Sequence, residues 1–327
     1  MTVRNIVRKG LAPVIGSERV DRLVDGEAKA RASLASWIAP TERPAPVPAS
    51  APAETAPESE YPLAPNGYRI YPFDASRFPE PTLTRHEFLT GLHEVLQPRA
   101  YLEIGVDDGR SLTLSRTKTI GVDPAFHIVS PLRSDLLLAR ETSDDFFAST
   151  QAQDHLAGTP LDLAFVDGMH WAEFAYRDFI NVEKLCGPLS VVVLDDMMPR
   201  TVHEAARDRY TDSWAGDVYK VVELLRTERP DLIVVPVNTF PTGVVLVLSV
   251  DPASTVLGDR YDDLLAGLTS ADPQDVPDEV IERTRAVDGR DLIAWPGWAE
   301  LRDLRERPRA TAMRRKLLAS FAETFVR

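Results

Sequence analysis

The chain has 327 residues, of which 44% are hydrophobic and 27% charged, so its composition permits an ordinary globular core. The formal net charge of −13 argues against broad binding to nucleic-acid phosphates, which requires clustered lysine and arginine, and is compatible with a small-molecule or glycan ligand. Cys186 is the single cysteine, which excludes an intrachain disulfide, and we interpret it as a small buried side chain. Because no targeting sequence and no apolar run of membrane-spanning length is visible, we expect a cytoplasmic protein without a transmembrane segment.

Residues 1–39 are predicted to form an N-terminal helical segment, in which Ser17 caps the helix. Glu27 and Arg31 interrupt its apolar side, so the amphipathic pattern is weak. The helix is expected to dock on the main domain or on a second copy of the chain, and a reversible anchor to a membrane surface or to a partner enzyme is the alternative. Residues 40–66 hold eight prolines and are predicted to form a flexible linker, because such segments bury little apolar surface.

Residues 67–250 are predicted to form an α/β domain. Thr84 and Glu87 make a capping-box pattern at the start of a helix that Pro98 ends. Strand and helix patterns then alternate, which predicts a parallel sheet with helices on both faces. The expected strands are 100–104, 118–123, 135–140, 162–167 and 190–195, and the expected helices are 109–116, 143–153, 171–186 and 216–229.

The last two strands of this domain, 231–237 and 243–250, are joined by only five residues. This leaves no room for a crossover helix, so the two strands must pair as a hairpin and one of them must be antiparallel to the rest. Residues 251–327 are predicted to form a helical C-terminal extension.

The segment Glu103-Ile-Gly-Val-Asp-Asp-Gly109 lies at the first strand-to-helix turn. Gly105 removes a side chain where a ligand approaches the backbone, and Gly109 eases the turn into the helix. The start of that helix offers free N–H groups to a carboxylate. A carboxylate inside the apolar context of Glu103 is costly without a partner, and the ammonium group of a bound ligand would serve as one.

Asp123 ends the next strand, about twenty residues after this turn. An acidic residue at this place accepts hydrogen bonds from ribose hydroxyls in nucleotide-binding sheets. The alternative is that Asp123 only caps the following turn. The dinucleotide fingerprint G-x-G-x-x-G is absent, which disfavours an NAD-linked oxidoreductase.

Asp167 ends one strand, and Asp195 and Asp196 end the strand that follows. Three carboxylates that converge at one edge repel one another unless a cation lies between them, and oxygen ligands suit Mg²⁺. His170 follows Asp167 by three residues and is a candidate proton acceptor near neutral pH. The alternatives are solvated strand-end turns for the aspartates and a helix-capping or core-edge role for His170.

Taken in order, these motifs resemble the class I S-adenosylmethionine-dependent methyltransferases. They are most similar to the branch that contains metal-dependent sugar O-methyltransferases of the macrocin type, and the resemblance covers about residues 68–250. It implies a Rossmann-like, doubly wound, seven-stranded sheet with an antiparallel last strand. It also implies the following roles: Glu103, Gly105, Gly109, Ser111 and Asp123 bind S-adenosylmethionine, Asp167, Asp195 and Asp196 hold Mg²⁺, and His170 is the catalytic base near the acceptor hydroxyl.

The sequence departs from the relatives at three positions. Asp107 stands where most methyltransferases carry another glycine, and His170 and Asp196 replace a lysine and an asparagine of the catechol-methylating relatives. The expected function is Mg²⁺-assisted O-methyl transfer to a sugar, a glycan or another small diol-bearing metabolite. The alternatives are a non-catalytic binding or scaffold protein with the same fold, and a nucleotide-dependent oxidoreductase.

Overall fold

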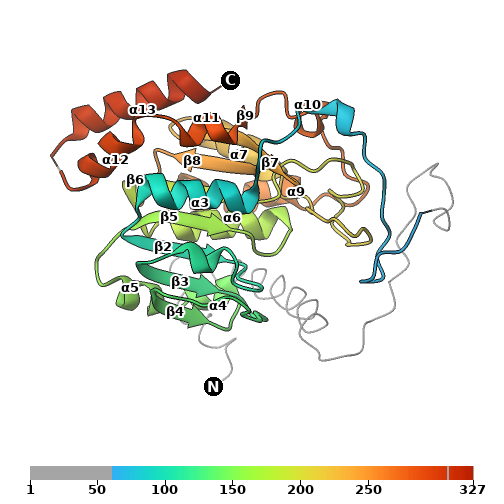
Figure 1. The fold of residues 1–327 in the computed structure, drawn as a ribbon, viewed down its shortest axis with the longest axis horizontal. Coiled ribbons are helices and arrows are strands. Elements are labelled where there is room, and N and C mark those ends of the chain that lie inside the picture. The colour runs from blue at the N-terminus through green and yellow to red at the C-terminus, as the bar shows by residue number, and fades with distance from the viewer. Residues whose placement is uncertain (1–60, 308, 327) are drawn as a thin grey trace. The chain divides into compact units, whose positions relative to one another are not determined.

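The computed structural model describes residues 61–307 and 309–326, so the helix predicted within 1–39 and most of the linker predicted at 40–66 lie outside the described residues. The described strands form one nine-stranded sheet in the order β1-β7-β8-β6-β5-β2-β3-β4, with β9 paired to β7 (Figure 1). The strands are β1 (Leu83–Thr84), β2 (Ala100–Ile104), β3 (Lys118–Val122), β4 (Asp135–Ala139), β5 (Leu161–Val166), β6 (Cys186–Leu194), β7 (Ile233–Phe240), β8 (Val244–Leu248) and β9 (Val287–Asp288).

The strand directions follow the predicted pattern. Strands β2 to β6 pair in parallel, and β8 is antiparallel to both of its neighbours, β6 and β7. The fold class is therefore confirmed: an α/β, Rossmann-like sheet whose last long strand is antiparallel. The sequence did not predict β1 and β9, because a two-residue strand is too short to show an alternating pattern.

The helices cover both faces of the sheet. They are η2 (Ala75–Arg77), α3 (Arg85–Leu96), η3 (Leu112–Leu114), α4 (Ser143–Phe147), α5 (Gln151–Leu156), α6 (Ala172–Glu183), α7 (Lys220–Glu228), α8 (Val256–Asp259), α9 (Tyr261–Leu268), α10 (Asp278–Ile281), α11 (Gly289–Ile293), α12 (Trp298–Arg305) and α13 (Thr311–Phe325), where η marks a 3-10 helix. None of the described helices is both long and apolar enough to cross a membrane.

Two hydrophobic cores lie on opposite faces of the sheet, because successive side chains of each strand point to opposite sides. Helices α4 to α9 contribute to one core, and α3, α11, α12 and α13 contribute to the other (Figure 1). The second core contains the buried side chains of Trp298 and Phe321 from the C-terminal extension. The extension therefore supplies part of the packing that positions α3.

The capping box at the start of α3 is present, since Thr84 Oγ1 accepts from Glu87 N and a Glu87 carboxylate oxygen accepts from Thr84 N. The helix predicted at 109–116 is wrong: this segment forms only the three-residue 3-10 turn η3. Its hydroxyl side chains make contacts with distant parts of the chain, such as the hydrogen bond from Thr113 Oγ1 to Pro131 O (2.6 Å).

Cys186 does not end a helix, because α6 stops at Glu183 and Cys186 begins β6. Its side chain is buried, as predicted, and burial raises the pKa of the thiol to about 12. The thiol is therefore protonated at neutral pH.

Candidate functional site

The carboxyl ends of β2, β3, β5 and β6 meet at one edge of the sheet. The ladder of backbone hydrogen bonds continues one residue beyond these strands: Asp167 N donates to Ile104 O (2.8 Å), and Asp195 N donates to Val166 O (3.0 Å). The residues that follow the strands therefore lie at one level, as expected. The predicted site residues on this edge and on the loop after β2 are Glu103, Gly105, Gly109, Ser111, Asp123, Asp167, His170, Asp195 and Asp196.

Glu103, near the end of β2, is fully buried. Its two carboxylate oxygens accept from Tyr101 Oη (2.6 Å) and Ser111 Oγ (2.6 Å), both neutral donors. Burial raises the pKa of Glu103 to about 8, although the hydrogen bonds from Ser111 and Tyr101 favour the ionised form. The site therefore holds a carboxyl group whose ionisation at neutral pH depends on added positive charge.

The loop after β2 has the left-handed backbone that glycine favours. Gly105 has φ of 84°, and a Cβ atom there would lie 1.7 Å from the backbone oxygen of Asp167. Gly105 is thus required by contact with the end of β5 in addition to any contact with a ligand. Asp107 adopts φ of 47°, which lies in the left-handed region where glycine has no Cβ penalty.

Asp123 follows β3 and faces this loop. One of its carboxylate oxygens accepts from Asp107 N (2.9 Å), and the other accepts from Ala125 N (2.6 Å). Asp123 therefore caps the turn, as the structural alternative predicted. Each oxygen keeps a further lone pair, so the capping does not prevent it from accepting a ligand hydroxyl.

The three aspartates after β5 and β6 are joined into one network by two cationic groups. Arg85 Nη1 contacts Asp195 Oδ2 and lies 2.9 Å from Asp167 Oδ2. On the other side, His170 Nε2 lies 3.2 Å from Asp167 Oδ1 and 3.2 Å from Asp196 Oδ2. Asp167 is the centre of this network, because it shares one oxygen with each cation.

Arg85 is the site residue that sequence reasoning missed. It is the first residue of α3, and Asp195 and Asp167 together raise its pKa against the effect of burial. A cation in the first turn of a helix is unfavourable beside the positive end of the helix dipole. The position of Arg85 in the first turn of a helix is therefore a signal in the sequence that it has an acidic partner elsewhere in the chain.

His170 is fixed from both sides of its ring. Nδ1 lies 2.9 Å from the backbone oxygen of Trp214, and the two rings stack with centroids 4.9 Å apart. Gly216 makes this approach feasible, because a Cβ atom there would lie 1.7 Å from His170 O. Although burial opposes the charged ring, Asp196 and Asp167 raise the pKa of His170 to about 9.

Asp195 and Asp196 remain short of positive charge despite these partners. Burial is the main cause that raises the pKa of both carboxyl groups, and repulsion from neighbouring aspartates adds to it. Asp196 Oδ1 also accepts from Thr242 Oγ1 in the turn between β7 and β8. Sequence reasoning missed Thr242 as well, since its role depends on how this turn packs.

The site offers ligand atoms to a metal ion. Asp167, His170 and Asp196 each present one such atom, and the three atoms lie within 4.8 Å of one another. Asp195, which was predicted as a metal ligand, has one oxygen against Arg85 and is not in this group. The donor set of oxygens with one imidazole nitrogen fits a divalent cation of the first transition row and also, through its oxygens, Mg²⁺.

Comparison with known proteins matches residues 102–197 to the family described as "Methyltransferase domain". The matched segment runs from β2 to the loop after β6, so it contains every predicted site residue. No curated protein matches the chain.

Several solved structures have low similarity to this chain. Cofactor-bound Rv0187 from MTB and an O-methyltransferase from Bacillus cereus in complex with SAH are each 18% identical, with 54% of this chain and 86% of theirs covered and a TM-score of 0.38. The O-methyltransferase TomG from Streptomyces achromogenes, in complex with SAM, is 18% identical, with 51% and 80% covered and a TM-score of 0.37. Similarity of this size carries no conclusion about activity, and the strand order establishes the fold independently.

Proposed function

We propose that this chain is a class I, S-adenosylmethionine-dependent methyltransferase that methylates a hydroxyl oxygen of a small diol-bearing acceptor such as a sugar or a glycan. The match of residues 102–197 to a methyltransferase domain supports the proposal. The observation that carries the proposal is the contact between the loop after β2 and the acidic network. Gly105 packs against the backbone of Asp167, so a methyl donor held by that loop lies next to the carboxylates. Assignment to the sugar O-methyltransferase branch is part of this proposal.

We propose that the cofactor is bound by Glu103 of β2, by Gly105 and Gly109 of the loop after β2, and by Asp123 after β3. Glu103 fits the ammonium group of the methionine part, because its carboxyl group is buried and has only neutral donors. Asp123 fits the ribose, since both oxygens keep free lone pairs. Ser111 acts through Glu103, which it holds in place, in addition to any contact with the cofactor carboxylate.

A metal ion would be held by Asp167 and Asp196, with His170 or Asp195 close by. The raised pKa values of Asp195 and Asp196 support this proposal, since they show that added positive charge stabilises the ionised carboxylates. Bound Mg²⁺ would stabilise the alkoxide form of an acceptor hydroxyl. Arg85 keeps Asp167 and Asp195 in a fixed arrangement with or without the ion.

His170 is the proposed proton acceptor. The backbone oxygen of Trp214 can only accept a hydrogen bond, so Nδ1 carries the proton and Nε2 is the nitrogen that faces Asp167 and Asp196. Additional positive charge on these carboxylates favours the neutral ring, which is the form that accepts a proton from an acceptor hydroxyl. General base catalysis of this kind contributes about 10²–10⁴-fold.

The test is formation of S-adenosylhomocysteine from S-adenosylmethionine with a panel of glycosides and catechols, with and without Mg²⁺. We expect turnover with an acceptor that has vicinal hydroxyls, and loss of turnover in EDTA. Binding of S-adenosylhomocysteine without turnover of any acceptor would support the scaffold alternative, and binding of NAD would support the oxidoreductase. Action in the cytoplasm and docking through the N-terminal helix stay predictions.

A further inference from the structure

Arg283 is a buried arginine whose hydrogen-bond partners, within the part of the chain that the structure describes, are all neutral. It lies in the C-terminal extension, between α10 and β9, and its exposed fraction is 2%. Burial lowers the pKa of its guanidinium to about 10, so the group is still charged at neutral pH. A buried cation without a paired carboxylate costs desolvation free energy. Hydrogen bonds from the guanidinium to neutral acceptors must therefore offset this cost.

The guanidinium joins two chain segments that are far apart in the sequence. Arg283 Nη2 donates to Pro241 O (2.6 Å) and to Met198 O (3.3 Å). Nη1 donates to Asn238 Oδ1 (2.7 Å) and to Thr239 O (3.2 Å). One partner thus belongs to the loop after β6, and the other three belong to the end of β7 and the turn into β8.

These two segments are the ones that position Asp196. Met198 follows Asp196 by two residues, and its backbone N–H donates to Thr242 O (2.7 Å). The hydroxyl of Thr242 donates to Asp196 Oδ1. Gly243 permits the close packing, because a Cβ atom there would lie 2.1 Å from Met198 Cε. Arg283 therefore links the loop after β6 to the turn between β7 and β8 through hydrogen bonds to both.

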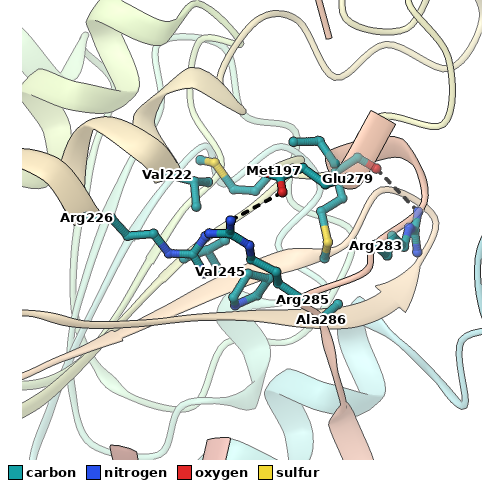
Figure 2. Close-up of a pocket in the computed structure, with 11 residues that line it drawn as sticks. Met197, Val222, Arg226, Val245, Glu279, Arg283, Arg285 and Ala286 are labelled. Atoms are coloured by element: carbon teal, nitrogen blue, oxygen red, sulfur yellow. Dashed lines mark hydrogen bonds and ion pairs between the residues drawn. The ribbon is translucent and has the colours of Figure 1, made fainter. Parts of the chain in front are cut away.

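A small pocket lies next to the same loop. Met197, Met198, Val245 and Arg283 are among the residues that line it (Figure 2). Methionine side chains are flexible and adapt to irregular gaps, so their packing alone does not fix the backbone that follows Asp196. The planar guanidinium, with five donors in a rigid fork, matches several carbonyl groups at once in a way that a lysine ammonium cannot.

We propose that Arg283 is a positioning residue for Asp196, through which the C-terminal extension becomes part of the site. The catalytic consequence rests on the function proposed above, whereas the positioning itself does not. The described hydrogen-bond partners of Arg283 include none of the residues proposed to bind the cofactor, so its loss should affect the acidic network and spare cofactor binding.

The test compares Arg283→Met with Arg305→Met in the full chain. Arg305 is a matched control, because it is also a buried arginine of the extension and its burial also lowers its pKa. Arg305 Nη1 instead donates to Leu96 O (2.9 Å), at the C-terminal end of α3, and faces Asp162 near the start of β5. A general loss of stability from removing a buried arginine would affect both variants.

The measurements are kcat, KM for S-adenosylmethionine, the Kd of S-adenosylhomocysteine, and hydrogen exchange at the amides of Met198 and Gly243. For Arg283→Met we expect kcat to fall roughly 10- to 100-fold, the loss typical of a displaced catalytic group, and faster exchange at both amides. The Kd of S-adenosylhomocysteine should stay within about twofold, as expected for a distant site. Arg283→Lys keeps the charge but not the planar group of donors. Its kcat and its exchange rates at both amides should lie between those of Arg283→Met and the wild type.

Unchanged exchange at Met198 and Gly243 in Arg283→Met would overturn the proposal, and so would faster exchange with kcat equal to that of Arg305→Met. If Arg283→Met does not fold, the same criteria apply to Arg283→Lys. If the wild-type protein turns over no acceptor, the proposed function fails. The exchange comparison between the Arg283 and Arg305 variants then decides the positioning role by itself.

Discussion

Two groups of carboxylates lie at the same edge of the sheet and are stabilised in different ways. On the side proposed to bind the cofactor, Glu103 is buried among neutral donors, the hydroxyls of Tyr101 and Ser111. On the side proposed to bind the acceptor, Asp167 and its two neighbours are linked by the cationic groups of Arg85 and His170. Glu103 has no cationic partner among the described side chains that bond to it, whereas the aspartate network already contains the cationic groups of Arg85 and His170.

This difference implies separate roles for the two groups at one edge of the sheet. A buried carboxyl group without a cation is neutral or costly, so a cationic ligand gains binding free energy by ionising it. A network that is already linked by cations is preformed, and a further cation must compete with Arg85 or with the proton of His170. We therefore expect cofactor binding to depend on the ionisation of Glu103, and the reaction to depend on the balance of charge around Asp167.

The largest expected effect is that of His170→Ala. Removing the proposed base should lower kcat about 10²–10⁴-fold, while the Kd of S-adenosylhomocysteine changes little, because the ring contacts the acidic network and not the cofactor loop. Steady-state kinetics and calorimetric titration measure the two quantities. His155→Ala is the matched control, since His155 lies on α5 and contacts Asp135 O at the opposite end of the sheet. Equal kcat in both variants would remove His170 from the mechanism.

Arg85→Met should cost about 3 kcal/mol of unfolding free energy, the lower range for a buried pair that loses one partner. Because Asp195 is then left without a cation and Asp167 keeps only His170, Mg²⁺ should stabilise this variant more than it stabilises the wild type. Thermal unfolding of both proteins, with and without Mg²⁺, tests this. Arg85→Lys keeps the charge and should reduce the difference. An equal response to Mg²⁺ in Arg85→Met and the wild type would show that the metal does not bind where Arg85 lies.

Glu103→Gln should change the pH dependence of stability. The pKa of Glu103 is raised to about 8, so in the ligand-free protein the folded state binds a proton that the unfolded state has lost above about pH 4.5. Wild-type stability from this group should therefore fall as pH rises from about 4.5 to 8, by about 1.4 kcal/mol per unit. Glu103→Gln should lack this decline, as urea unfolding at pH 5.5 and 7.5 can show.

The same variant tests the cofactor contact. Glu103→Gln should bind S-adenosylhomocysteine roughly 10- to 100-fold more weakly at pH 8, because a hydrogen bond between charged groups contributes about 1.5–3 kcal/mol. The wild-type affinity should rise with pH up to about 8, since the ammonium group of the ligand requires the ionised carboxylate. Affinity that does not vary with pH in either protein would place the ammonium group away from Glu103.

The sequence predicted the sheet and its acidic edge well because both depend on local patterns. Short apolar runs indicate buried strands, and a carboxylate that directly follows such a run lies at the end of the strand. This placement does not depend on how distant parts of the chain pack. Asp167 and Asp195 were placed correctly for this reason. The prediction of a helix at 109–116 was wrong in a segment where Ser111 and Thr113 bond to Glu103 and Pro131, contacts that a hydrophobic pattern does not reveal.

The partners of the acidic residues could not be predicted in the same way. Arg85 lies 82 residues before Asp167 in the sequence, and it reaches the site only because α3 packs on the sheet against the C-terminal extension. The contact of Thr242 with Asp196 likewise depends on how the turn between β7 and β8 packs. The contacts of Arg283 depend on how the segment between α10 and β9 packs. The prediction that three aspartates need a cation was sound physically, but the sequence did not show that the chain supplies cations of its own.

The smallest expected effect is that of Thr242→Val, which removes the hydroxyl that donates to Asp196 while keeping the side-chain shape. Leaving a buried carboxylate oxygen without this donor should cost about 1–3 kcal/mol of unfolding free energy. If the acidic network is preformed, as the comparison with Glu103 implies, the other contacts of Asp196 should hold it, and kcat should fall less than in His170→Ala. Thr242→Ser keeps the donor and serves as the control for side-chain volume. A loss of kcat in Thr242→Val as large as that in His170→Ala would contradict this. It would show that the position of Asp196 depends on the single hydrogen bond from Thr242 and that the cations of the network do not maintain it.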